Sequence, residues 1–110
     1  DRNGLDGLAD ALAERLDRLT QVTRTLLACP EPQVRLANAT TYLEAFGHIV
    51  VAWIWLDQAL ACGDARSAFH EARRCACRFF FIYELPRVDP QLALLQQLDR
   101  LTLDIAEAML

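Results

Sequence analysis

Apolar residues recur every three to four positions along most of this chain, which is typical of helices packed against one another. The most apolar stretch is Tyr42–Cys62, and every position from 49 to 56 within it is apolar, Trp53 included. A helix that is apolar all round is buried on every side. A strand is the rival interpretation, because Ile, Val and Trp favour sheets. Residues 40–62 contain no proline, however, and strands rarely exceed about ten residues, so a helix is favoured.

This long, buried helix is predicted to be the second of four. It begins at Pro32, because proline is tolerated in a first turn, and it ends at about Cys62, before Gly63. Gly47 lies in its middle, where glycine costs up to about 1 kcal/mol relative to alanine. We interpret that cost as a sign that another backbone passes close to Gly47. Other helices must cover this central one.

The first helix is predicted over about Leu5–Ala28 and stops at the two prolines, Pro30 and Pro32, because each removes a backbone donor and restricts the residue before it. Its apolar stripe consists of Leu5, Leu8, Leu12, Leu16, Leu19, Thr23 and Leu26.

The third helix is predicted over about Ala65–Leu85 and ends at Pro86. Asp89 and Pro90 then suit the N-cap and the first position of a fourth helix that reaches the end of the chain. The core stripe expected for the third helix is Ala65, Phe69, Ala72, Ala76, Phe79 and Tyr83. Short connections make neighbouring helices antiparallel, so residues 1–110 predict one all-α domain, an up-down four-helix bundle with a long, buried second helix.

Composition excludes several classes of protein. A net charge of −4 disfavours free nucleic acid as a partner, and all basic residues are arginine. The fully apolar run around Trp53 is shorter than the roughly 20 residues that cross a bilayer, so no membrane span is expected. The chain shows no secretory signal, so a cytoplasmic location is expected. It begins at Asp1 rather than Met, which suggests a piece of a longer protein.

The residues that carry chemistry do not form a catalytic or metal-binding pattern, so no catalytic, cofactor-binding or metal residue is predicted. The cysteines are expected to be reduced apolar fillers, although Cys29 and Cys62, both at helix ends, could form an accidental bridge. His48 follows Glu44 by four residues, so that carboxylate is expected to pair with its ring.

The third helix also carries a candidate docking face. The expected face consists of Arg66, His70, Arg73, Arg74, Arg78 and Phe81. Arginine beside an aromatic residue is enriched at interfaces, although a solvated arginine face is the simpler interpretation. On either interpretation, reversing Arg74 and Arg78 to Glu should leave the melting temperature of the isolated bundle nearly unchanged.

Three segments resemble one known domain. They are residues 36–43 with 46–48 and 51–53, then residues 76–80 with 84–87, and finally Asp99 with residues 101–105. In order and spacing they are similar to the extra C-terminal helical domain of acyl-CoA dehydrogenase-like flavoenzymes, among them long-chain bacterial members and the methylmercaptopropionyl-CoA dehydrogenase group. The resemblance covers about residues 36–110. The family usually has Gly-Lys where this chain has Ala72-Arg73, and often proline at Thr41.

The resemblance implies a bacterial parent enzyme that oxidises an acyl-CoA thioester at Cα–Cβ, with a Glu base and FAD as hydride acceptor. The family's catalytic Glu and most of its FAD and CoA contacts lie upstream of this segment. We therefore expect a non-catalytic packing or assembly domain, whose partners are the upstream domains and a second subunit. The alternative is a free-standing helical domain that binds a protein or a ligand.

Overall fold

The computed structural model describes residues 3–109, and all regular structure in that range is helical. The longer helices are α1 (Leu8–Ala28), α3 (Ala39–Ala61) and α4 (Ala68–Phe79). A π-helical turn, Phe80–Glu84, and a 3-10 turn, Leu85–Arg87, connect α4 to α5 (Val88–Gln96). Two short helices complete the chain, α2 (Pro32–Leu36) and α6 (Leu101–Met109).

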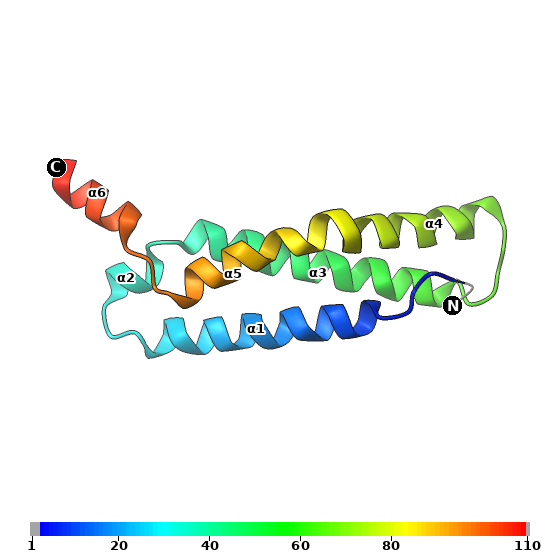
Figure 1. The fold of residues 1–110 in the computed structure, drawn as a ribbon, viewed down its shortest axis with the longest axis horizontal. Helices are drawn as coiled ribbons and strands as arrows, with labels where there is room; N and C mark the ends of the chain where they lie inside the picture. The colour runs from blue at the N-terminus through cyan, green and yellow to red at the C-terminus, as the bar shows by residue number, and fades with distance from the viewer. Residues whose placement is uncertain (1–2, 110) are drawn as a thin grey trace.

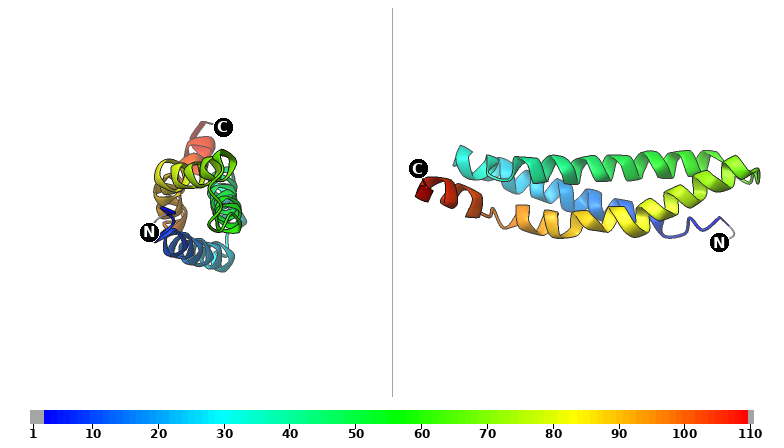
Figure 2. Two further views of the ribbon diagram at one scale, coloured as in Figure 1. Left: turned by 90° about the vertical axis from the view of Figure 1, so that its right-hand side faces the viewer. Right: turned by 90° about the horizontal axis from the view of Figure 1, so that it is seen from above.

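Three rods lie side by side (Figures 1 and 2). The first is α1, the second is α3, which runs back along it, and the third is α4 continued by α5, which runs back along α3 (Figure 1). The helices α1, α3, α4 and α5 pack on one another. The predicted all-α bundle with antiparallel neighbours is therefore confirmed, and its second helix is long, as expected.

The chain does not reverse at Pro86, where the sequence suggested a new helix. Pro86 occupies the 3-10 turn, and Leu85 and Val88 on either side of it keep helical dihedral angles. A proline near the start of a helical turn removes a donor that has no intrahelical acceptor in any case. As a result, α4 and α5 form one rod (Figure 1).

Asp89 ties that rod to α1 instead of capping a helix. It lies inside α5, and its carboxylate accepts hydrogen bonds from the Arg15 Nε and Nη2 atoms at 3.1 and 3.0 Å and from Arg18 Nη1 at 2.8 Å. A carboxylate that accepts two hydrogen bonds from one planar guanidinium group is held in a defined geometry. The contact therefore fixes how far α5 lies along α1.

Two of the predicted helices are interrupted. The second breaks around Asn38, between α2 and α3, and the fourth breaks at Leu98, whose φ of 52° is left-handed. The two breaks meet, because Asn38 Nδ2 donates to the Asp99 carbonyl oxygen at 2.9 Å. Beyond this point α6 projects from the bundle and buries no side chain among its described residues (Figure 1).

The core lies between the three rods. From α3 it receives one face only: Ala45, Ile49, Ala52, Leu56 and Ala59. From the third rod it receives Arg74, Cys77, Phe81, Leu85, Val88, Leu92 and Leu95, whose positions follow one another by three or four residues straight through Pro86. The prediction that α3 is covered on every side is therefore wrong for this chain, and Trp53 is 60% exposed.

By length and composition, α3 is the one helix among the described residues that could cross a membrane, with 22% of its most apolar window buried. A single helix of this kind is weak evidence for a span.

Candidate functional site

The expected docking face of the third helix is divided between the core and the surface. Phe81 and Arg74 are buried, at 6% and 1% exposure, so neither can lie on an outward docking face. The reason is that the turns that follow α4 continue its core stripe into α5, which directs the side of α4 that bears Arg74 and Phe81 inward. The placement of Arg74 and Arg78 together on an exposed face is therefore wrong for Arg74, and we expect reversal of its charge to lower stability.

Arg74 closes the connection between α3 and α4. Its Nη2 atom donates to the carbonyl oxygens of Gly63 at 2.9 Å and Ala65 at 2.5 Å, and its Nη1 atom donates to Glu71 Oε1 at 3.0 Å. Carbonyl oxygens just beyond a helix C-terminus have no intrahelical donor and carry partial negative charge. A buried guanidinium satisfies both carbonyls at once. Its Nε atom has no hydrogen-bond partner among the described residues.

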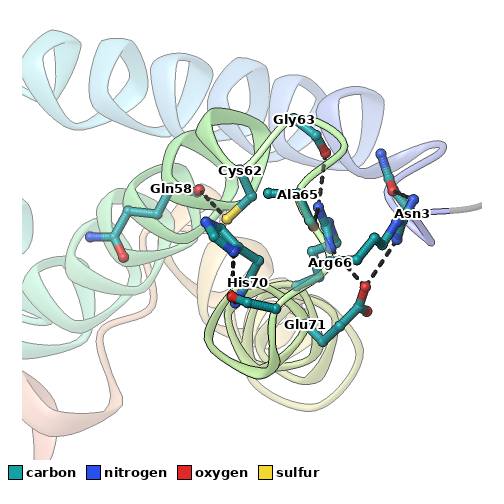
Figure 3. A network of polar contacts seen from close by, with 10 residues as sticks. Asn3, Gln58, Cys62, Gly63, Ala65, Arg66, His70 and Glu71 are labelled. Atoms are coloured by element: carbon teal, nitrogen blue, oxygen red, sulfur yellow. Dashed lines mark hydrogen bonds and ion pairs between the residues drawn. The ribbon is translucent and has the colours of Figure 1, made fainter.

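The neighbouring polar side chains extend this network to the start of the chain (Figure 3). Arg66 donates to Glu71 Oε1 at 3.1 Å and to Asn3 Oδ1 at 2.6 Å. The hydrogen bond from Arg66 holds the pKa of the Glu71 carboxyl below its usual range, with the charges of Arg74 and Arg66 adding to the effect. Ser67 caps α4, and its Oγ atom lies 2.5 Å from His70 Nδ1. These contacts explain the local fold at the start of α4.

The two remaining arginines of the expected face occupy different sides of α4. Arg73 lies over the Phe69 ring, 4.5 Å from its centroid, and donates to Gln58 Oε1 on α3. Arg78 packs against Gly4, where a Cβ atom would lie 2.8 Å from the Arg78 Cδ atom. Docking of Arg66, His70, Arg73 and Arg78 onto a partner stays a prediction, but these side chains are already engaged within the chain.

The side of α4 that was expected to be core faces outward instead. Phe69, Phe79 and Tyr83 are 61%, 56% and 63% exposed. They share this side with two small residues, and together form what we call the α4 stripe: Phe69, Ala72, Ala76, Phe79 and Tyr83. Between α4 and α3 lies an open groove of about 370 Å³, lined by Trp55, Gln58, Phe69, Ala72, Arg73 and Ala76.

The outward side of α3 is equally apolar. One row of positions runs along it with alternating steps of four and three, the spacing of a coiled-coil seam. We call this row the α3 seam: Leu43, Gly47, Val50, Ile54, Asp57 and Ala61. Trp53 and Leu60, 60% and 59% exposed, flank it. The spacing was visible in the sequence, but the seam was missed because the whole of α3 was expected to be buried.

Gly47 was expected to mark the close approach of another backbone. Within this chain nothing lies within 4 Å of the position that a Cβ atom would occupy there. The glycine therefore faces open space, on the same side as the rest of the α3 seam.

The other candidate residues have local roles. His48 Nε2 lies 3.6 Å from a Glu84 carboxylate oxygen, and its Nδ1 atom meets the Glu44 backbone carbonyl, so the carboxylate partner is Glu84 and not Glu44. All four cysteines are free, and Cys29 and Cys62 lie at opposite ends of the antiparallel α1–α3 pair, so the conceivable bridge between them does not form. Within the described residues, no group of three or more His, Cys, Asp or Glu side chains could hold a metal ion.

Comparison with known proteins gives one family. The model of a family described as "Acetyl-CoA dehydrogenase C-terminal like" matches residues 1–106. Searches of curated proteins and of solved structures found no match.

Proposed function

Since this chain belongs to the acetyl-CoA dehydrogenase C-terminal-like family, we propose that it is a non-catalytic packing and assembly domain of an acyl-CoA dehydrogenase-like, FAD-dependent enzyme. The parent enzyme would desaturate an acyl-CoA thioester at Cα–Cβ. Its flavin, its catalytic base and its substrate would be held by domains other than this one. The family match along nearly the whole chain is the observation that carries this proposal.

Two features of the structure support an assembly role. Two polar clusters hold the bundle together: Arg74 closes the turn between α3 and α4, and Asp89 joins α5 to α1. The surface that remains is instead rich in apolar side chains, on the α3 seam and the α4 stripe. An exposed apolar patch of this kind marks an interaction site.

Calorimetry on residues 1–110 tests the non-catalytic part of this proposal. Titration with FAD, and separately with an acyl-CoA, should give no heat of binding, because the proposal leaves the flavin and the substrate to other domains of the parent enzyme. Micromolar affinity for either ligand would contradict it.

A second measurement tests the assembly part. In the full-length polypeptide, deletion of residues 1–110 should lower the thermal stability or change the subunit composition of the protein. A deletion that changes neither would remove the assembly role.

A further inference from the structure

We propose that a pocket at the α2 end of the bundle binds a small carboxylate with an apolar body. The carboxylate pairs with Arg35, and the apolar body lies among leucines of α1, α2 and α3. The pocket lies where α2 connects α1 to α3, at the end of α3 opposite to the Arg74 network (Figure 1). This inference goes beyond the proposed function and does not rest on it.

The pocket has the size and the lining of a small-molecule site. Its volume is about 310 Å³, and ligand pockets in proteins occupy about 300–1,000 Å³ and are lined mainly by apolar side chains. Four helices, α1, α2, α3 and α5, supply its large apolar side chains: Leu26, Leu27, Leu36, Tyr42, Leu43 and Leu95. Because a water-sized group occupies about 30 Å³, the pocket accommodates roughly ten non-hydrogen atoms, as many as octanoate contains.

Leucine side chains around this pocket remain uncovered within the chain. Leu27, Leu36 and Leu43 come from three different helices and are 69%, 65% and 67% exposed. Removal of apolar surface from water is favourable. Since one pocket gathers all three leucines, a single small ligand with an apolar body can contact them together.

The hydroxyl groups in the pocket are satisfied within the chain. Thr23 Oγ1 donates to the Leu19 carbonyl oxygen at 2.8 Å and lies 2.8 Å from the Tyr42 hydroxyl oxygen, so Tyr42 donates to Thr23. This hydrogen bond holds the Tyr42 ring in place as a wall of the pocket. Both hydroxyl protons are then used within the chain, so this part of the pocket favours an apolar group of the ligand.

Arg35 is the one charged residue in the lining of the pocket. Its Nε and Nη2 atoms donate to the Cys29 carbonyl oxygen at 3.3 and 2.8 Å, which orients the guanidinium group. Among the described residues Arg35 forms no ion pair, so no carboxylate of this part of the chain neutralises its charge. A guanidinium group matches a carboxylate in geometry. A single positive charge also suits a monocarboxylate better than a doubly charged phosphate.

Calorimetric titration of the 110-residue chain with octanoate tests the proposal. The wild type should bind a single octanoate with a Kd below about 1 mM, a modest affinity for a ligand of this size. Arg35→Met keeps the length of the side chain and removes its charge, so it should weaken binding by more than about tenfold. 1-Octanol, which has no negative charge, should bind the wild type more weakly than octanoate does.

Two further variants separate binding from folding. Arg24→Met removes an exposed arginine of α1 that does not line the pocket, so it should leave octanoate binding unchanged. Ala39→Phe keeps Arg35 and places a ring at a position that lines the pocket, so it should abolish binding even if Arg35→Met proves unstable. Far-UV circular dichroism of each variant establishes that the helices are intact.

Three results would overturn the inference. The first is a wild type with no saturable binding of octanoate at millimolar concentrations, as expected if an apolar segment of the parent polypeptide covers the pocket instead. The second is undiminished binding by folded Arg35→Met, which would show that Arg35 does not recognise the carboxylate. The third is equal binding by the wild type and Ala39→Phe, which would place octanoate elsewhere. None of them touches the proposed function, because octanoate contains neither a flavin nor coenzyme A.

Discussion

At the scale of single residues, Arg74 shows how a charged side chain can be buried without a buried carboxylate as its partner. Its partners are two backbone carbonyl oxygens, from Gly63 and Ala65, and the partly exposed Glu71. The energy of such hydrogen bonds comes from the ionised donor and from acceptors that would otherwise stay unpaired. The end of α3 and the start of α4 are therefore held together by one side chain.

Arg74→Leu should lower the free energy of unfolding of the isolated chain by about 2–3 kcal/mol, because two carbonyl oxygens near the α3 C-terminus lose their charged donor. Arg87→Leu serves as the control. The side chain of Arg87 is 70% exposed, so its loss should change stability by less than about 0.5 kcal/mol. Urea denaturation measures both, and equal effects would mean that Arg74 does not hold the turn.

Cys77 gives the chain a pH dependence of stability at high pH. Burial raises the pKa of its thiol from 9.0 to about 11. Below pH 9 the thiol is protonated in both folded and unfolded chains, so it has no effect on the pH dependence. Between pH 9 and 11 the unfolded chain releases this proton while the folded chain keeps it, so stability falls as pH rises.

We therefore expect the stability difference between wild type and Cys77→Ala to be smaller at about pH 10 than at about pH 8. Urea denaturation at the two pH values provides the measurement. A constant difference for Cys77→Ala would show that its thiol ionises in the folded chain.

At the scale of elements, the sequence predicts the helices better than their orientation. The three-to-four periodicity located α1 to within a few residues of its ends. It also located the middle of α3 and of α4, but it began the second helix at Pro32 and extended the third to Leu85. It could not decide which side of α4 faces inward, because both sides are apolar: Cys77 and Phe81 on one, Phe69 and Phe79 on the other. The core stripe that continues from Phe81 across Pro86 to Leu92 would have decided it, but a proline was interpreted as a helix end.

The unknown orientation of α4 also explains why the docking face was predicted wrongly in part. Arg74 and Phe81 were placed on the outer side of the third helix together with Arg66 and Arg78. The acceptors of Arg74 include backbone carbonyl oxygens of a turn. Every residue has such an oxygen, so the residue types in the sequence do not indicate which ones accept from Arg74. Charge alone therefore predicted an exposed position for Arg74, where the structure has a buried one.

The last helix, α6, should be dispensable for the fold. It buries no side chain, and its tie to the bundle includes a hydrogen bond from Thr102 to the Ala37 carbonyl oxygen at 3.2 Å. A chain that ends at Arg100 should retain the unfolding free energy of the full chain to within about 1 kcal/mol. Denaturant unfolding of the shortened chain measures this.

A second truncation, which also removes buried residues of α5, serves as the comparison for the loss of α6. Ending the chain at Gln91 also removes Leu92 and Leu95, which are 1% and 2% exposed. Loss of two buried leucines should abolish cooperative unfolding, since each contributes several kcal/mol, about 2–5 by truncation to alanine. If ending at Arg100 is as damaging as ending at Gln91, α6 is part of the bundle.

At the scale of the whole molecule, shape explains why no helix is covered all round. The Cα atoms extend over 59 × 25 × 16 Å, with a radius of gyration of 17.6 Å, against about 13 Å for a compact domain of this length. Three long rods in so thin a body each keep one side toward water (Figure 2). The side of α3 that faces water can be covered only by contacts from outside the described residues.

The two tryptophans lie on α3 where their fluorescence can report whether its exposed sides become covered. The chain contains two tryptophans. Trp53 flanks the α3 seam and is exposed, and Trp55 lines the groove between α3 and α4. Indole emission shifts to shorter wavelength when water leaves the ring. The intrinsic fluorescence of the unlabelled protein therefore reports when this surface becomes covered, with no emission from tryptophan elsewhere in the bundle.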